Sequence, residues 1–205
     1  MEIKVLELGE IGVNCYLIAG DNSVVVIDPG FESEVVTNFL KENSHKDRMI
    51  ILTHSHFDHI SAAEKLRTDT DTKIAIGVFD NPALSDVKLN LSYLFGVNLS
   101  PFSADILLYD GDLFKVGDLE FKVIHTPGHT VGGISLLIDD ILISGDTLFY
   151  QSIGRTDFPG GDFKTLLDSL EKLFLLDGEI TVLPGHGIKT TIKHEREYNP
   201  YRKKS

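Results

Sequence analysis

Short apolar runs separated by polar turns alternate along the first part of the chain. The runs at residues 24–27 and 48–53 are dominated by apolar residues, which is typical of strands covered on both faces of a sheet. Between them, Val36, Phe39 and Leu40 recur at the spacing that places side chains on one side of a helix. The pattern therefore predicts strands at residues 2–8, 13–19, 24–27 and 48–53, and a helix at residues 33–42.

From residue 106 onward the pattern indicates strands more often than helices. Asp139 and Asp140 separate two apolar runs and predict a tight hairpin. Asp162 is a suitable N-cap for a helix in which leucines recur at helical spacing. We expect strands at residues 113–115, 120–125, 133–138, 141–144 and 180–183, and helices at residues 163–174 and 190–198.

The middle of the chain is less regular. Residues 61–67 have the spacing of a helix, and residues 73–76 can form a short strand. The long segment at residues 80–102 carries several aromatic residues among polar ones. Two interpretations are open: a surface excursion with its own apolar cluster, or a lid that faces a substrate.

The two parts of the chain follow a similar order, from strands to a histidine-bearing turn and later to a helix. No low-complexity linker separates them. We therefore predict a single α/β domain over residues 1–205, built as a four-layer αββα sandwich with two mixed β-sheets flanked by helices.

The composition is that of a globular protein, with 42% hydrophobic and 24% charged residues among 205. A formal net charge of −12 disfavours nucleic acid and anionic membranes as partners. No apolar run approaches the roughly 20 residues that cross a bilayer, and we see no secretory signal. The one cysteine, Cys15, excludes an internal disulfide. A cytoplasmic protein without nucleic-acid or membrane partners is therefore expected.

The most informative feature is a run that directly follows the apolar strand at 48–53. It contains His54, His56, Asp58 and His59 within six residues. Imidazole and carboxylate groups are ligands of divalent transition metals. A solvated polar loop would explain one histidine but not three of them around an aspartate. The run therefore predicts a metal site.

Three further turns each place a ligand-type residue beside a glycine at the end of an apolar strand. They contribute His129, Asp146 and His186. The full set exceeds the four ligands of one tetrahedral site and suits two divalent metals that share a carboxylate. Zinc is the expected metal, with iron or manganese also compatible. The candidate metal ligands are His54, His56, Asp58, His59, His129, Asp146 and His186.

These residues resemble the metallo-β-lactamase superfamily, and the resemblance covers nearly the whole chain. The run at 54–59 resembles the signature H-x-H-x-D-H, and Asp28 matches the acidic residue of the first motif, which usually supports the ligands from outside. The resemblance implies that His54, His56 and His129 bind the first metal and that Asp58, His59 and His186 bind the second. It also implies that Asp146 bridges the two metals.

Asp146 and the residues after it narrow the resemblance within the superfamily. True lactamases often carry a cysteine or a non-bridging residue at this position, whereas an aspartate resembles glyoxalase II. Residues 184–200 most resemble the short bacterial and archaeal glyoxalase II-like proteins. The implied activity is hydrolysis of a small, anionic hydroxyacyl thioester by a hydroxide held between two metals, with Asp58 orienting the second metal and handling the proton.

Three alternatives to this activity remain open. Residues 152–162 also resemble persulfide dioxygenases, which use one iron and mainly the first set of ligands. A hydrolase of another ester, a lactone or a phosphodiester would use the same residues. A binding module with a degraded site is disfavoured, because no ligand position is substituted. In the shared loop, Arg155 either pairs internally or holds an anion. We favour a structural role, since a buried arginine usually has an acidic partner.

The end of the chain bears on the substrate. Full glyoxalase II has a helical C-terminal domain that holds glutathione, and a chain of 205 residues leaves no room for it. Glutathione recognition is therefore not assumed. The basic residues at 202–204 are expected to form a frayed tail. The sequence does not predict the oligomeric state.

Overall fold

Two six-stranded sheets form the centre of the protein, which we describe from a computed structural model over residues 1–202. Residues 203 and 204 of the expected basic tail lie outside this range. The first sheet has the order β1-β2-β3-β4-β5-β6, and its pairs are antiparallel from β1 to β3 and parallel from β3 to β6. Its strands are β1 (Glu2–Leu8), β2 (Val13–Ala19), β3 (Ser23–Ile27), β4 (Asp47–Leu52), β5 (Ile74–Gly77) and β6 (Ile106–Leu108).

The second sheet has the order β14-β13-β10-β9-β8-β7 and is also mixed, because β10 and β13 are parallel. Its strands are β7 (Leu113–Val116), β8 (Leu119–His125), β9 (Ile134–Ile138), β10 (Ile141–Gly145), β13 (Thr181–Pro184) and β14 (Thr190–Thr191). A small antiparallel pair, β11 (Leu148–Phe149) and β12 (Ser152–Ile153), follows β10.

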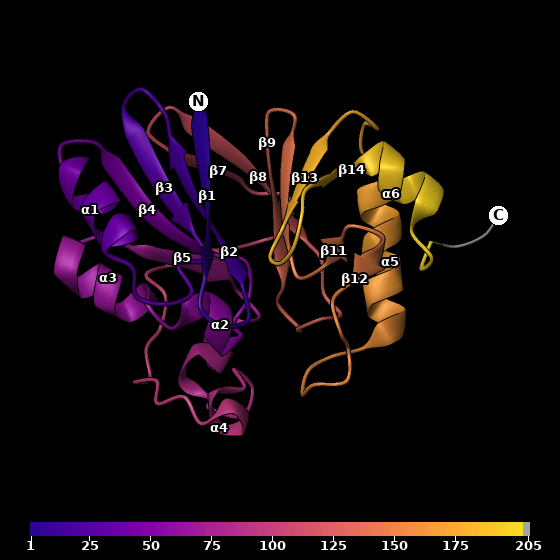
Figure 1. Ribbon diagram of the computed structural model, residues 1–205, viewed down its shortest axis with the longest axis horizontal. Coiled ribbons are helices and arrows are strands. Elements are labelled where there is room, and N and C mark those ends of the chain that lie inside the picture. The colour runs from indigo at the N-terminus through magenta and orange to yellow at the C-terminus, as the bar shows by residue number, and fades with distance from the viewer. Residues whose placement is uncertain (203–205) are drawn as a thin grey trace.

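Helices cover the outer face of each sheet (Figure 1), and the predicted four-layer αββα sandwich is confirmed. The helices α1 and α3 lie outside the first sheet, and α5 and α6 lie outside the second. The helices are α1 (Glu34–Glu42), α2 (Phe57–Ile60), α3 (Ala63–Thr70), α4 (Ser92–Phe95), α5 (Phe163–Phe174) and α6 (Ile192–Tyr198), with a 3-10 turn η1 (Asn81–Ser85). No helix within residues 1–202 is long and apolar enough to span a membrane.

Strand β3 shows why an apolar run was required at this position. Val25 and Ile27 pack into the core between the two sheets, whereas Val24 and Val26 pack into the core between the first sheet and its helices. Successive side chains of a strand point to opposite faces, so a strand with helices on one side and a sheet on the other needs apolar residues throughout. A third core joins the second sheet to α5 and α6.

Several expected boundaries differ from the structure for local reasons. The helix expected at 61–67 spans Ala63–Thr70 and ends where Asp71 adopts a left-handed backbone with φ of 50°. The first two residues of the helix expected at 190–198 instead form β14, and the Thr191 side chain caps α6 by accepting from the His194 N–H at 3.2 Å. Asp162 is the expected N-cap, since it accepts from the Thr165 N–H at 2.7 Å.

Candidate metal centre

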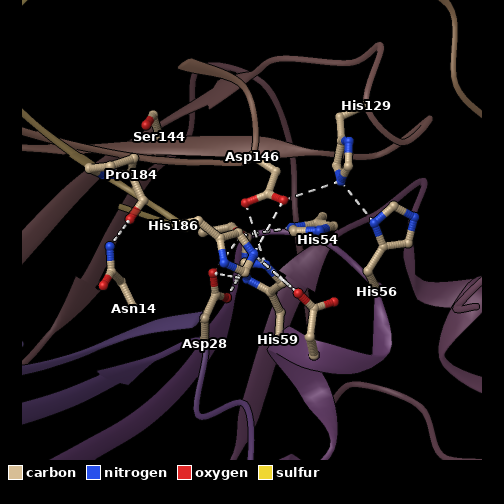
Figure 2. Close-up of polar contacts among 12 residues, drawn as sticks. Asn14, Asp28, His54, His56, His59, His129, Ser144, Asp146, Pro184 and His186 are labelled. Carbon is tan, nitrogen blue, oxygen red and sulfur yellow. Dashed lines mark hydrogen bonds and ion pairs between the residues drawn. The ribbon is translucent and has the colours of Figure 1, made fainter. Parts of the chain in front are cut away.

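The candidate ligands lie in the loops that follow strands of both sheets, and these loops meet in one region of the protein. Asp28 comes directly after β3, and His54 comes two residues after β4. In the second sheet, His129 follows β8, Asp146 follows β10 and His186 follows β13. Figure 2 shows that these side chains point toward one another from the two sheets. The structure thus brings together every residue predicted for the site.

Two residues of the signature run lie on a helix that the sequence pattern did not predict. Residues 57–60 form the short helix α2, which carries Asp58 and His59. One helical turn is too short to show a periodic apolar pattern. This helix places Asp58 and His59 beside His186, whereas His54 and His56 lie beside His129.

The first group consists of three buried histidines, His54, His56 and His129, whose ligand nitrogens lie within 4.8 Å of one another. His56 Nδ1 lies 2.8 Å from His129 Nε2. The other nitrogen of His129 donates to the Arg155 carbonyl at 2.7 Å, which directs the Nε2 lone pair inward. His54 Nδ1 lies 3.1 Å from the Thr53 hydroxyl, and His54 Nε2 is buried without a hydrogen-bond partner in residues 1–202. Three lone pairs can therefore face one cation.

The second group consists of Asp58, His59 and His186. His186 Nε2 lies 3.1 Å from Asp58 Oδ2 and 3.3 Å from His59 Nε2. The outer nitrogen of each histidine is held by an oxygen: His59 Nδ1 donates to Asp28 at 2.8 Å, and His186 Nδ1 donates to the Gly12 carbonyl at 3.1 Å. Both rings consequently present Nε2 to the group.

Asp146 lies between the two groups. Its Oδ1 is 3.4 Å from His59 Nε2, and its Oδ2 is 3.5 Å from His129 Nε2 and 3.6 Å from His186 Nε2 (Figure 2). Oδ1 is buried and accepts no hydrogen bond from the described residues. Gly185 must be a glycine here, because a Cβ would overlap Asp146 Oδ1 and lie 2.8 Å from His59 Cε1. A carboxylate that reaches both groups in this way can be shared between two ions.

Asp28 supports both groups from behind. Its carboxylate accepts from the Thr53 N–H at 2.8 Å, from the Thr53 hydroxyl at 2.6 Å and from His59 at 2.8 Å. The Thr53 hydroxyl in turn faces His54. The carboxylate also lies within 4.8 Å of ligand nitrogens of His54 and His59, so these three residues form a further group that could hold an ion. Because the Asp28 oxygens already accept three hydrogen bonds, its role as a residue that orients ligands stays our prediction. Thr53 was missed, and its only sequence signal is its position directly before His54.

Two imidazoles of the first group, His54 and His56, are neutral near neutral pH. Burial lowers the pKa of His54 well below its ordinary value, and the neighbouring histidines lower it further. Burial and the adjacent His129 lower the pKa of His56 to about 3. Neutral imidazole is the form that binds a metal.

The second group contains opposite charges. Burial acts to lower the pKa of His59, but the carboxylates of Asp58, Asp146 and Asp28 outweigh it and raise that pKa well above its ordinary value. Burial acts to raise the pKa of Asp146, and the surrounding imidazoles, His59 first, hold it far below its ordinary value. Two carboxylates therefore remain ionised at the centre, where a cation would be stabilised.

An aromatic wall, formed by Phe57, Phe95 and Phe158, stands beside the first group. The Phe57 ring stacks on Phe95 with centroids 4.8 Å apart, and Phe158 lies 6.0 Å from the His56 ring. Phe95 belongs to the segment at 80–102, which is tied to α2 by a hydrogen bond from the Phe57 N–H to the Asn90 carbonyl at 2.8 Å. The segment thus packs against the signature run, which fits the substrate-facing interpretation, while Phe102 packs into the helix-side core.

Arg155 has the acidic partner that was expected of it. Its guanidinium donates two hydrogen bonds of 2.7 Å to Asp157, and it lies 3.7 Å above the Phe158 ring centroid. The side chain is exposed and not buried as the prediction assumed, so the pair contributes little to stability. Its backbone carbonyl, which holds His129, is the part of Arg155 that reaches the centre.

The fold and this centre agree with the comparison to known proteins. The family model described as "Metallo-beta-lactamase superfamily" matches residues 8–186, and the chain belongs to this superfamily. "Probable metallo-hydrolase YqgX" of Bacillus subtilis is 36% identical over 206 residues, covering 98% of this chain and 97% of the relative. "Hydroxyacylglutathione hydrolase GloC" of Haemophilus influenzae is 33% identical over 207 residues, covering 98% and 97%.

Two solved structures are similar over nearly their whole length. The BLEG-1 B3 metallo-β-lactamase has a TM-score of 0.90 at 37% identity, covering 98% of this chain and 99% of that one. TTHA1623, in a di-iron-bound form, has a TM-score of 0.85 at 33% identity, covering 97% and 99%. The superfamily consists mainly of hydrolases, and the chain is a member with His and Asp groups that could hold metal ions.

Proposed function

We propose that the protein is a metal-dependent hydrolase with two divalent ions, and that its substrate is a small anionic thioester of the glyoxalase II type. The observation that carries the proposal is the placement of Asp146 between two complete groups of ligands. Buried polar atoms without partners are costly, so the free Nε2 of His54 and the free Oδ1 of Asp146 indicate that a cation completes the site.

The donors fit divalent transition metals. In the proposed arrangement, His54, His56 and His129 would hold the first ion, and Asp58, His59 and His186 would hold the second. Asp146, which lies between the two groups, would be shared. Zinc suits imidazole and carboxylate ligands, and iron or manganese accepts the same donors. The di-iron form of TTHA1623 shows that a related chain can hold iron, so we leave the choice to metal analysis.

When bound, the two ions would supply a hydroxide near neutral pH and would polarise the carbonyl oxygen of the substrate. We propose that Asp58 accepts the proton of the attacking water. Asp58 lies at the edge of the second group, with Oδ2 3.1 Å from His186 Nε2. The new C–O bond replaces the C–S bond, and the products are a carboxylic acid and a thiol. A thiol has a pKa of about 8.5, so the departing thiolate needs no strong general acid.

The choice of a thioester is supported by two features. Asp146 stands where glyoxalase II-like sequences carry an aspartate. The GloC relative, named a hydroxyacylglutathione hydrolase, is matched over 97% of its own length, so a protein of this size carries that name without an added domain. Glutathione thioesters are therefore retained among the proposed substrates. The cytoplasmic location and the single domain over 1–205 stay predictions.

A second candidate is a persulfide dioxygenase with one iron. It is favoured by the first group alone, because His54, His56 and His129 bring three imidazoles together without help from the second group. This candidate predicts one iron per chain and consumption of oxygen with a glutathione persulfide.

The proposal is tested by metal analysis of the purified chain together with an assay panel. The panel contains a glutathione thioester, a β-lactam, a lactone, a phosphodiester and glutathione persulfide. We expect two metals per chain and highest activity on the thioester. Highest activity on the lactam, lactone or phosphodiester would contradict the proposed thioester substrate but would still support a hydrolase.

A pair of histidine variants controls for the site. His56→Ala should lose metal and activity together, whereas His45→Ala, which alters an exposed histidine, should keep both. Full metal content and full thioesterase activity in His56→Ala would contradict the proposal.

A further inference from the structure

Asp80 is a buried carboxylate that lies outside the ligand groups. It follows β5 and precedes η1, and its exposed fraction is 2%. Among residues 1–202, no lysine, arginine or histidine forms an ion pair with it. Burial raises its pKa, and the hydrogen bonds that it accepts from the chain oppose that rise. Burying a carboxylate without a paired cation costs free energy, so the hydrogen bonds that stabilise Asp80 in this position indicate what it does.

Each oxygen of Asp80 holds the backbone of a different loop. Oδ2 accepts from the Ser55 N–H at 2.9 Å, and Oδ1 accepts from the Gly132 N–H at 2.6 Å. Ser55 lies between His54 and His56, and Gly132 follows His129 by three residues. One carboxylate thus joins the two loops that carry all three members of the first group, and these loops follow strands of opposite sheets.

The surrounding backbone leaves little freedom for this link. A Cβ on Gly132 would overlap the Asp80 backbone nitrogen and lie 2.6 Å from Asp80 Oδ1. A Cβ on Gly77 would overlap the Gly132 carbonyl oxygen. The turn after β5 therefore packs backbone against backbone on the loop after His129, and the Asp80 carboxylate sits at a fixed distance from both loops.

We propose that Asp80 is a positioning residue that sets the spacing of His54 and His56 relative to His129, so that the three imidazoles fit one ion. The inference rests on the proposed metal binding by this group. It differs from the role of Asp28, which accepts directly from the His59 ring of the second group, because Asp80 accepts from backbone N–H groups of the two loops that carry the first group. If Asp80 merely stabilised the fold, its substitution would weaken metal binding by both groups alike.

The test compares the two groups separately by titrating zinc into the metal-free chain with a competing chelator. His186→Ala leaves the first group intact, and His56→Ala leaves the second. In the His186→Ala background, Asp80→Asn should weaken zinc affinity about 10–100-fold, because an amide can accept only one of the two N–H groups. In the His56→Ala background, the same change should alter affinity less than about threefold.

A matched control and a conservative variant complete the design. Asp86 is exposed and also accepts two backbone N–H groups, from Lys88 at 2.9 Å and Leu89 at 3.2 Å, so Asp86→Asn should leave both affinities unchanged. Asp80→Glu keeps the negative charge and should lower zinc affinity at the first group selectively, but by less than Asp80→Asn. If Asp80→Asn does not fold, the zinc affinity of Asp80→Glu is the decisive measurement.

Equal losses in both backgrounds, or no loss in the His186→Ala background, would overturn the inference. A wild-type chain that binds no zinc, iron or manganese would instead overturn the proposed function.

Discussion

The two ends of strand β3 are held by carboxylates that make the same number of hydrogen bonds in different surroundings. At its start, the exposed Asp118 accepts from the N–H groups of Asp21 and Asn22 and from the Ser23 hydroxyl, at 2.7–2.9 Å. After its last residue, the buried Asp28 accepts two bonds from Thr53 and one from His59.

The difference lies in what replaces a lost bond. Water can satisfy the N–H groups of the exposed residues Asp21 and Asn22 if Asp118 is removed, so that end contributes modest stability. No water competes at the buried end, where an unpaired group is costly and the bonded partners are candidate ligands. The same chemistry therefore supports the fold at one end of β3 and the metal centre at the other. The following changes would break or sharpen this comparison.

The largest effect is expected from Asp146→Ala at the buried end. Removing the carboxylate that both groups share should lower kcat/KM for the thioester by about 10³-fold or more. The metal content should fall as well, as measured by elemental analysis after gel filtration. Asp140→Asn, in the exposed β9–β10 turn, is the control and should keep both. Retained activity in Asp146→Ala would contradict the proposal that two metals share this carboxylate.

A smaller effect is expected from Asp28→Asn. The amide can still accept from Thr53, but its NH₂ group cannot accept the proton of His59 Nδ1. Metal affinity should fall about 10–100-fold, with the larger share at the second group. Chelator competition measures both. An unchanged second group would show that His59 needs no orienting partner.

The smallest effect is expected from Asp118→Asn, and it should depend on pH. The hydrogen bonds from Ser23, Asn22 and Asp21 lower the pKa of Asp118 from 3.8 to about 2. The carboxylate therefore stabilises the fold above pH 3.8, and this contribution is lost as the pH falls from 3.8 toward 2.

Urea unfolding midpoints of wild type and Asp118→Asn should differ at pH 6 and converge toward pH 2. Thioesterase activity at pH 7 should be the same in both proteins. A difference that grew on acidification would contradict the assigned cause.

The parts of the molecule that sequence reasoning predicted share a physical reason. Strand β3 was visible because it must be apolar on both faces. The candidate ligands were visible because few side chains bind transition metals and because four of them fall in one short run.

The features that the sequence did not reveal depend on backbone groups or on elements too short to show a pattern of side chains. Asp80 accepts from the backbone N–H groups of Ser55 and Gly132, and every residue except proline offers such a group, so the sequence does not mark these partners. Helix α2 and the pair β11–β12 are too short for a period to show. The support of His129 by a carbonyl of Arg155 is likewise invisible, because a carbonyl has no side-chain identity.

The placement of His186 has a consequence for how the protein is made. Its turn is held by the side chain of Asn14, which donates to the Pro184 and Gly187 carbonyls at 2.9 Å each across more than 160 residues of sequence. A ribosome that adds about 5–20 residues per second reaches His186 roughly 7–26 s after His54. During that interval the nascent chain carries the signature histidines without the residue that closes the second group. An ion captured at the second group during that interval would therefore be held by an incomplete set, and metal loading of this group follows synthesis of the turn after β13.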